Sequence, residues 1–251
     1  MTDQDLEQLR LVFEVMERLR APGGCPWDRA QSHQTLVPFL LEESYETIQA
    51  IEEGSSEELA EELGDLLVEV AMHCAISAEE GSFDIGGVAR TAAQKMIGRH
   101  PHVFGDTQVS GVEQVLSNWE DLKRKEKPDR ESALDGIPRS LPALALASSL
   151  QRRQERVGGE ILAVAALTEA ERLIQSRLHQ LRQAEGSAEG LIGELLFAVV
   201  ALARHHQVDA EGALRRTAEA RRQVFRRAEL EAAREAPHPR DQANHEATQP
   251  S

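Results

Sequence analysis

The residues of this sequence best suited to chemistry are carboxylates spaced so that they share a helix face. Residues 38–73 hold ten glutamates and one aspartate and contain no lysine or arginine. On a helix that turns by about 100° per residue, Glu42, Glu43 and Glu46 would share one edge. A second stripe would lie within an arc of about 100° and would comprise Glu58, Glu61, Glu62, Asp65 and Glu69.

Two interpretations of these stripes are open. Acidic stripes commonly form the solvent face of amphipathic helices. Two observations oppose a solvent face here. Like charges repel at i,i+3 and i,i+4 with no basic residue among them. In addition, Glu69 lies inside the apolar run LLVEVAMHCAI. If the two stripes face each other, a hard divalent cation is the simplest partner for them.

The type of ligand predicts the type of metal. The stripes offer only oxygen ligands, which suit Mg²⁺, with Mn²⁺ as a substitute. A di-iron bundle would need a Glu-x-x-His motif on each of two helices. Glu69 and His73 are four residues apart, so that motif is absent here.

The elements that would position these residues are helices. Aromatic residues make up only 4% of the chain, and helix-forming residues are abundant. Helical periodicity and breakers predict helices at about residues 2–19, 33–53, 56–80 and 85–99, with Ser56 as an N-cap. A short helix is expected within 112–127, and further helices from 143 to about 236. We therefore expect an all-α protein built of helical bundle units.

An internal repeat suggests how the chain is organised. Shifted by 129 residues, ELGDLLVEVA at 62–71 aligns with LIGELLFAVV at 191–200. We expect an N-terminal helical domain at 1–127, a linker at 128–142, a degenerate second copy at 143–236 and a disordered tail at 237–251. At the same offset, Glu171, Arg172 and Gln175 occupy the positions of Glu42, Glu43 and Glu46. Leu191 and Glu194 occupy the positions of Glu62 and Asp65.

Charge and cysteine content restrict the partners. The formal net charge of −15 opposes binding to polymeric nucleic acid or to anionic membranes, although a carboxylate-bound cation would still admit a small phosphorylated ligand. The two cysteines, Cys25 and Cys74, are too few for a disulfide framework. With no signal-like segment and no long apolar run, we expect a cytoplasmic protein.

The acidic pattern resembles a known signature. Glu42-Glu43-Ser-Tyr-Glu46 followed by Glu62-Leu-Gly-Asp65 resembles the EExxE…ExxD motif of the MazG nucleoside triphosphate pyrophosphohydrolases. The flanking stretches GCPWDRAQSHQTLVPFLLEESYE, KMIGRHPHVFGD and SALDGIPRSLPAL are similar to that family as well. The resemblance covers roughly residues 8–227.

The resemblance implies an all-α fold, usually dimeric, that uses Mg²⁺ to hydrolyse a nucleoside triphosphate to the monophosphate and pyrophosphate, in nucleotide-pool housecleaning. By position, the metal ligands would be Glu43, Glu46, Glu62 and Asp65. Glu42 would orient or deprotonate the attacking water. Equally, it would hold one of the metal-ligating side chains in place without itself touching the metal. Because only the first copy is complete, activity is expected there, and the second copy would serve packing or dimerisation.

Several residues are candidates for nucleotide contacts. Lys95 and Arg99 lie four apart on one helix face and could bind the triphosphate, or they could be ordinary surface cations. Trp27 could stack on a base or fill the core, and Asp28, Gln31 or His33 could lie near the base or sugar. The alternative function is a catalytically weak nucleotide-binding or regulatory protein, and a less favoured one is an acidic scaffold that recruits basic proteins.

Overall fold

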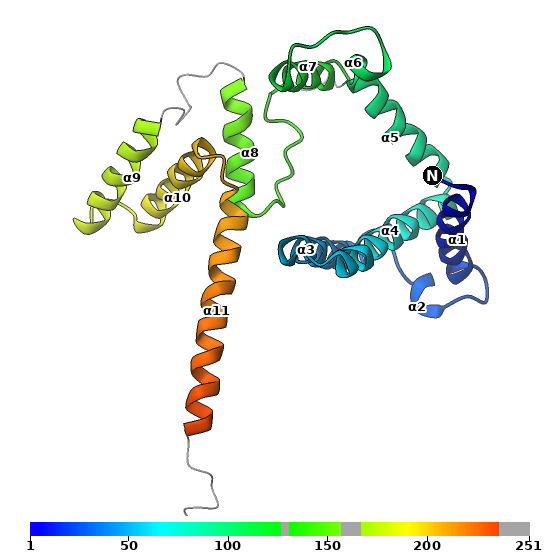
Figure 1. Cartoon of the computed structure of the whole chain (residues 1–251), viewed down its shortest axis with the longest axis horizontal. Coiled ribbons are helices and arrows are strands. Elements are labelled where there is room, and N and C mark those ends of the chain that lie inside the picture. The colour runs from blue at the N-terminus through cyan, green and yellow to red at the C-terminus, as the bar shows by residue number, and fades with distance from the viewer. Residues whose placement is uncertain (127–130, 157–166, 236–251) are drawn as a thin grey trace, which may run out of the picture. The chain divides into compact units, whose positions relative to one another are not determined.

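The structure, a computed structural model, describes residues 1–126, 131–156 and 167–235 (Figure 1). Its regular elements within these ranges are helices, and they include no strand, so the predicted all-α fold is confirmed. The chain divides into two compact units, Met1–Lys127 and Pro128–Ser251. None of the described helices combines the length and apolarity needed to cross a bilayer.

The first unit begins with the helices that carry and support the acidic stripes. They are α1 (Asp3–Arg20), the single turn α2 (Pro26–Arg29), α3 (Val37–Glu53) and α4 (Ser56–Glu79). Then follow α5 (Ile85–Arg99), α6 (Pro101–Phe104) and α7 (Val112–Lys125). The predicted helices at 2–19 and 85–99 therefore lie where the sequence pattern put them.

One expected helix start and one expected N-cap are wrong, whereas the helix expected from residue 56 does start there. The helix expected from residue 33 starts at Val37, and residues 33–36 form turns. Pro38 explains this start, because proline lacks the N–H that a helix interior needs and is tolerated only in the first turn. Ser55, and not Ser56, caps α4: its hydroxyl accepts a hydrogen bond from the Glu58 N–H at 3.2 Å.

Helices α3 and α4 form a hairpin whose short connection makes them antiparallel neighbours (Figure 1). Gly54 ends α3 in the left-handed conformation, at φ 76°, which glycine adopts without a steric cost. The buried cluster that holds α4 against α1 and the start of α3 comprises Met16, Leu36, Ala71, Met72 and Ile76, with Val12, Phe13, Leu19, Phe39 and Val68 packed around it. This core fixes the rotation of α4, and therefore the face on which its acids lie.

The second unit contains α8 (Ala143–Arg156), α9 (Leu167–Arg182), α10 (Ala188–His205) and α11 (Ala210–Glu235). Helix α10 packs against α9 and α8, and its buried residues are Ala198, Val200 and Ala201. The Gln151 amide of α8 donates to the Phe197 carbonyl at 2.8 Å. The predicted tail at 237–251 lies outside the described residues, and the predicted linker is described from residue 131 onward.

Candidate metal and nucleotide site

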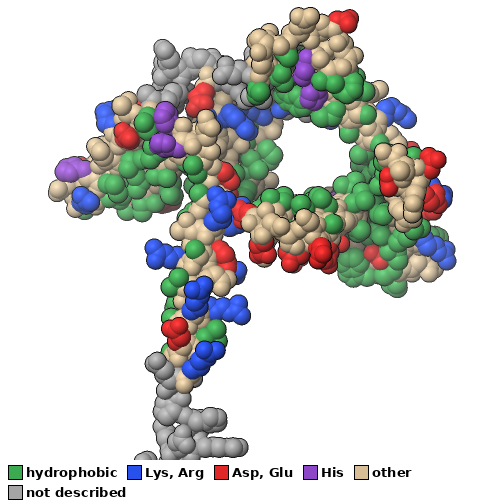
Figure 2. Space-filling view, in the orientation of Figure 1, with side chains coloured by type: hydrophobic (Ala, Val, Ile, Leu, Met, Phe, Trp, Pro, Cys, Tyr) green, Lys and Arg blue, Asp and Glu red, His purple; other side chains and the backbone are tan. Residues whose placement is uncertain are grey.

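Three of the four predicted metal ligands come together between α3 and α4. Glu43 of α3 and Glu62 and Asp65 of α4 each offer a carboxylate oxygen, and these oxygens lie within 4.8 Å of one another. Glu43 and Glu62 are half-buried and Asp65 is exposed. Figure 2 shows acidic side chains gathered over α3 and the adjoining part of α4. The hairpin thus juxtaposes the two stripes, as the metal-site interpretation requires.

The electrostatics of this group favour a cation. Burial, and then the neighbouring carboxylates of Asp65, Glu46, Glu62 and Glu42, raise the pKa of Glu43 above its ordinary value. Burial raises the pKa of Glu62 as well, followed by Glu46, Asp65 and two other acids of α4. Every influence that shifts these two pKa values therefore disfavours the charged form, and a bound divalent cation would reverse that balance.

The other two acids of the motif lie at the edge of the group. Glu46 raises the pKa of both Glu43 and Glu62, so its charge is close to them. Its oxygens are nevertheless not among the three that converge. Glu42 is exposed and contributes to raising the pKa of Glu43. Both residues are therefore within reach of water and of a ligand that lies over the group.

Glu69 behaves differently from the rest of its stripe. Only 8% of its surface is exposed, and its Oε2 atom has no hydrogen-bond partner. Burial raises the pKa of its carboxyl group. Glu69 is therefore buried within its apolar run, and its carboxylate lies outside the group of three converging acids.

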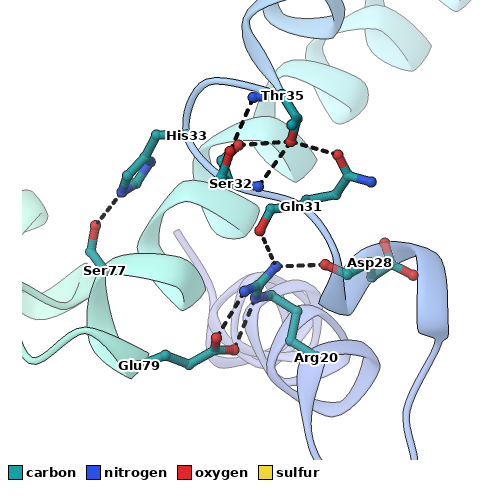
Figure 3. A network of polar contacts seen from close by, with 8 residues as sticks. All are labelled: Arg20, Asp28, Gln31, Ser32, His33, Thr35, Ser77 and Glu79. Atoms are coloured by element: carbon teal, nitrogen blue, oxygen red, sulfur yellow. Dashed lines mark hydrogen bonds and ion pairs between the residues drawn. The ribbon is translucent and has the colours of Figure 1, made fainter.

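The segment between α1 and α3 carries the candidate base-contacting residues. Trp27 is 53% exposed and meets the Phe39 ring edge-on, with centroids 5.7 Å apart, so it does not fill the core. Asp28 is buried, and its backbone carbonyl accepts a hydrogen bond from the Arg20 guanidinium (Figure 3). His33 contacts two residues of α4, His73 and Ser77.

The predicted phosphate-binding cations lie on α5 beside the end of α7. Arg99 forms an ion pair with Glu126 at 2.5 Å, and its guanidinium lies 5.3 Å from the centre of the Trp119 ring. Lys95 is exposed and contributes to lowering the pKa of Glu126, after the larger effect of the Arg99 hydrogen bond. Both cations therefore already face one carboxylate.

Sequence reasoning missed the residues that hold the segment before α3. Arg20 is 8% exposed and pairs with Glu79 of α4 at 2.8 Å, while also donating to the carbonyls of Asp28 and Gln31 (Figure 3). A signal existed for His73 and Ser77, because helical phase puts both near the buried Met72 and Ile76. No sequence signal indicated that His33 would be their partner.

The site thus consists of an all-α fold that places three carboxylates between two antiparallel helices, which is the oxygen-only ligand set that suits a hard divalent cation. Comparison with known proteins identifies the family. The MazG nucleotide pyrophosphohydrolase domain matches residues 31–104. The nucleoside triphosphate pyrophosphohydrolase of Escherichia coli K12 is 38% identical over 231 residues, which cover 89% of this chain and 88% of that protein.

Two further relatives carry related names. The nucleoside triphosphate pyrophosphohydrolase/pyrophosphatase MazG of Thermotoga maritima is 40% identical over 218 residues, or 84% of this chain and 83% of that protein. The nucleoside triphosphate pyrophosphohydrolase of Mycobacterium tuberculosis is 39% identical over 154 residues, or 61% of this chain and 46% of that protein. The chain belongs to the MazG family.

Proposed function

We propose that this protein is an enzyme that hydrolyses nucleoside triphosphates, ribo- or deoxyribo-, to the monophosphate and pyrophosphate. The observation that carries the proposal is the convergence of three carboxylate oxygens within 4.8 Å, contributed by Glu43, Glu62 and Asp65. The names of the E. coli and T. maritima relatives, which match along most of the chain, support the same activity.

The donor set fits a hard cation, because it consists of carboxylate oxygens only. Glu43, Glu62 and Asp65 would hold Mg²⁺, or Mn²⁺ in its place, with Glu46 completing the set from the edge. When bound, the ion supplies charge that neutralises the phosphate oxygens in the transition state. The three converging carboxylates would also fix the side of the hairpin on which the triphosphate binds.

Glu42 is proposed to orient the attacking water or to accept its proton. The water oxygen would bond to the α-phosphorus, and the bond from that phosphorus to the oxygen that bridges it to the β-phosphate would break. Pyrophosphate would leave with the bridging oxygen. The exposure of Glu42, and its effect on the pKa of Glu43, support a place beside the metal ligands.

Contacts to the rest of the nucleotide complete the proposal. Exposed Trp27 would stack on the base, with Asp28 and His33 holding the segment that presents it. Lys95 and Arg99 would attract the triphosphate, which would then compete with Glu126 for Arg99. A negatively charged substrate suits that exchange, since charge-assisted contacts of guanidinium groups to phosphate are strong.

A homodimer is proposed as the working form of the enzyme. Helices α3 and α4 expose several large apolar side chains, and a second copy would cover them: Val37, Leu40, Leu41, Tyr45, Leu63 and Val70. We also propose housecleaning of the nucleotide pool in the cytoplasm. The free thiols of Cys25 and Cys74 are compatible with a reducing compartment.

Pyrophosphate release tests the function. The purified protein is incubated with each NTP and dNTP in the presence of Mg²⁺, and pyrophosphate is measured, with Glu62→Ala as the inactive control. We expect release with at least one nucleotide and none without the metal. Absence of pyrophosphate with every nucleotide, at enzyme concentrations comparable to substrate, would refute hydrolysis. Nucleotide binding in that case would favour the alternative, a regulatory nucleotide-binding protein.

A further inference from the structure

Two histidines from distant parts of the chain meet through the same ring nitrogen. The Nδ1 atoms of His33, in the turn before α3, and His73, on α4, lie 2.6 Å apart. Their ring planes differ by only 10°, and the ring centroids are 4.9 Å apart. A separation this short requires a hydrogen bond, with an N–H on one ring and a lone pair on the other.

A third residue extends the contact. Ser77, which is completely buried one turn after His73, has its Oγ 3.1 Å from the Nε2 atom of His33 (Figure 3). A neutral imidazole carries a single N–H, so the two nitrogens of His33 have opposite roles. If His73 donates to His33, then His33 donates to Ser77; if His33 donates to His73, Ser77 donates to His33. The three residues therefore form one coupled chain of hydrogen bonds.

This chain joins the segment 21–36 to the helix that carries two metal-ligand candidates. The second side-chain anchor of the segment, Arg20, is itself bound to Glu79, so both anchors connect it to α4. Asp65 lies eight residues before His73, which is about 12 Å along a helix axis. His73 is thus too far along α4 to bind the same ion as Asp65, and the partner that the structure gives it is His33.

We propose that His73 is a positioning residue for nucleotide binding: its bond to His33, backed by Ser77, fixes segment 21–36 on α4 and so holds Trp27 where the base binds. This inference rests on the proposed function. It separates two tasks along α4, with Glu62 and Asp65 serving the phosphates and His73 and Ser77 serving the nucleoside end. Loss of the chain weakens substrate binding and leaves hydrolysis of bound substrate nearly unchanged.

The arrangement also makes binding sensitive to acid. A single added proton can occupy an Nε2 atom and leaves the Nδ1 bond in place, whereas protonation of both rings puts two N–H groups face to face across 2.6 Å and breaks it. Burial, and then the charge of His33, lowers the pKa of His73. The other titratable groups nearby are Glu69 and Cys74 on α4, and Glu79 with its partner Arg20. Because the pKa is lowered, the chain is intact at neutral pH and is lost only as the pH falls below the ordinary histidine range.

Substitutions of His73 test the proposal through separate kinetic constants. His73→Leu removes the nitrogen, whereas His73→Asn keeps a polar atom near the position of Nδ1. We expect His73→Leu to raise KM by about tenfold, the scale of one lost hydrogen bond, with kcat within about twofold. His73→Asn should recover most of the affinity. The control is His205→Leu, which changes an exposed histidine of the other unit.

The pH profile adds a readout that a merely structural role would not move. KM of the wild type should rise only once the pH is well below the ordinary histidine pKa of about 6.5, and this rise should be absent in His73→Asn. Imidazole ¹⁵N spectra of the wild-type protein, which need no variant to fold, should show a single N–H shared between His33 and His73. Separate titration of the two rings as independent histidines would overturn the proposal.

The outcomes distinguish this inference from the proposed function. A wild type that releases pyrophosphate while His73→Leu keeps its KM overturns only the inference, as does a loss confined to kcat. A wild type that binds nucleotide without hydrolysing it refutes the function, and the same variants are then compared by Kd. A wild type that neither hydrolyses nor binds any nucleotide overturns both.

Discussion

Arg177 of α9 forms an ion pair with Glu194 of α10, across the helix hairpin of the second unit. At the 129-residue offset these positions correspond to Ile48 and Asp65 of the first unit. A carboxylate that would face a metal ion in one unit therefore faces an arginine of its own chain in the other. Arg172, at the position of Glu43, pairs instead with Glu169 at 2.6 Å. We infer that the second unit keeps the hairpin without the cation site.

Glu194 should contribute little to turnover or to stability. Replacing Glu194 by Ala should change kcat by less than about twofold, because its charge is already neutralised by Arg177. The pair is largely exposed on the Glu194 side, so stability should fall by no more than about 1 kcal/mol. Steady-state kinetics and urea denaturation measure the two effects. A large loss of turnover would show that the second unit takes part in the chemistry.

Replacing Glu62 by Ala should have the opposite effects, a large loss of turnover and a gain in stability. Turnover should fall by about a hundredfold or more, because one of three converging carboxylates is lost. The fold should persist and melt at a higher temperature without metal, since a carboxyl whose pKa is raised by burial and neighbouring acids is removed. Kinetics and thermal melting check both parts against Glu80→Ala, a variant of an exposed acid just after α4. Retained turnover would refute the assignment of Glu62 as a ligand.

Metal binding should depend on pH in a direction that the pKa shifts determine. The pKa values of Glu43 and Glu62 are raised in the folded state, so the metal-free fold is favoured at low pH. The contribution of these two carboxyl groups to its stability is lost as the pH rises from their ordinary pKa through the raised pKa of the folded state. Mg²⁺ should therefore raise the melting temperature strongly near pH 7.5 and little near pH 4. Equal shifts at both pH values, or a shift retained in Glu62→Ala, would contradict a site at these acids.

Helical phase predicts some of the relationships between the site residues and not others. The convergence of Glu43 with Glu62 and Asp65 was predictable, because i,i+3 spacing fixes a face and a short connection pairs the two helices. The position of Glu46 at the edge of the group was not predictable, because it depends on how the two helices cross. The bond between His33 and His73 spans 40 residues and depends on the path of an irregular segment, which has no periodicity to interpret.

Glu69 should be a source of instability at neutral pH. Its carboxyl is buried, one oxygen has no partner, and burial raises its pKa, so the charged form opposes folding. Replacing it by Gln should raise the free energy of unfolding by about 1 kcal/mol near pH 7. The gain should vanish as the pH falls below the raised pKa, because the wild-type carboxyl is then neutral as well. Urea denaturation at the two pH values measures this difference. A destabilised Glu69→Gln would indicate that the charge of Glu69 has a partner in solution.

Arg20 should contribute far more to stability than other arginines of α1. Its guanidinium is buried, pairs with Glu79 and also satisfies the carbonyls of Asp28 and Gln31. Arg20→Leu should lower the free energy of unfolding by about 2–4 kcal/mol, since it leaves those two acceptors without their donor. Arg10→Leu is the matched control, because Arg10 pairs with Glu7 and Glu14 on the same helix but is 60% exposed, and it should cost less than about 1 kcal/mol. Amide hydrogen exchange should rise across residues 25–36 in Arg20→Leu alone. Equal effects of the two substitutions would show that Arg20 does not anchor this segment.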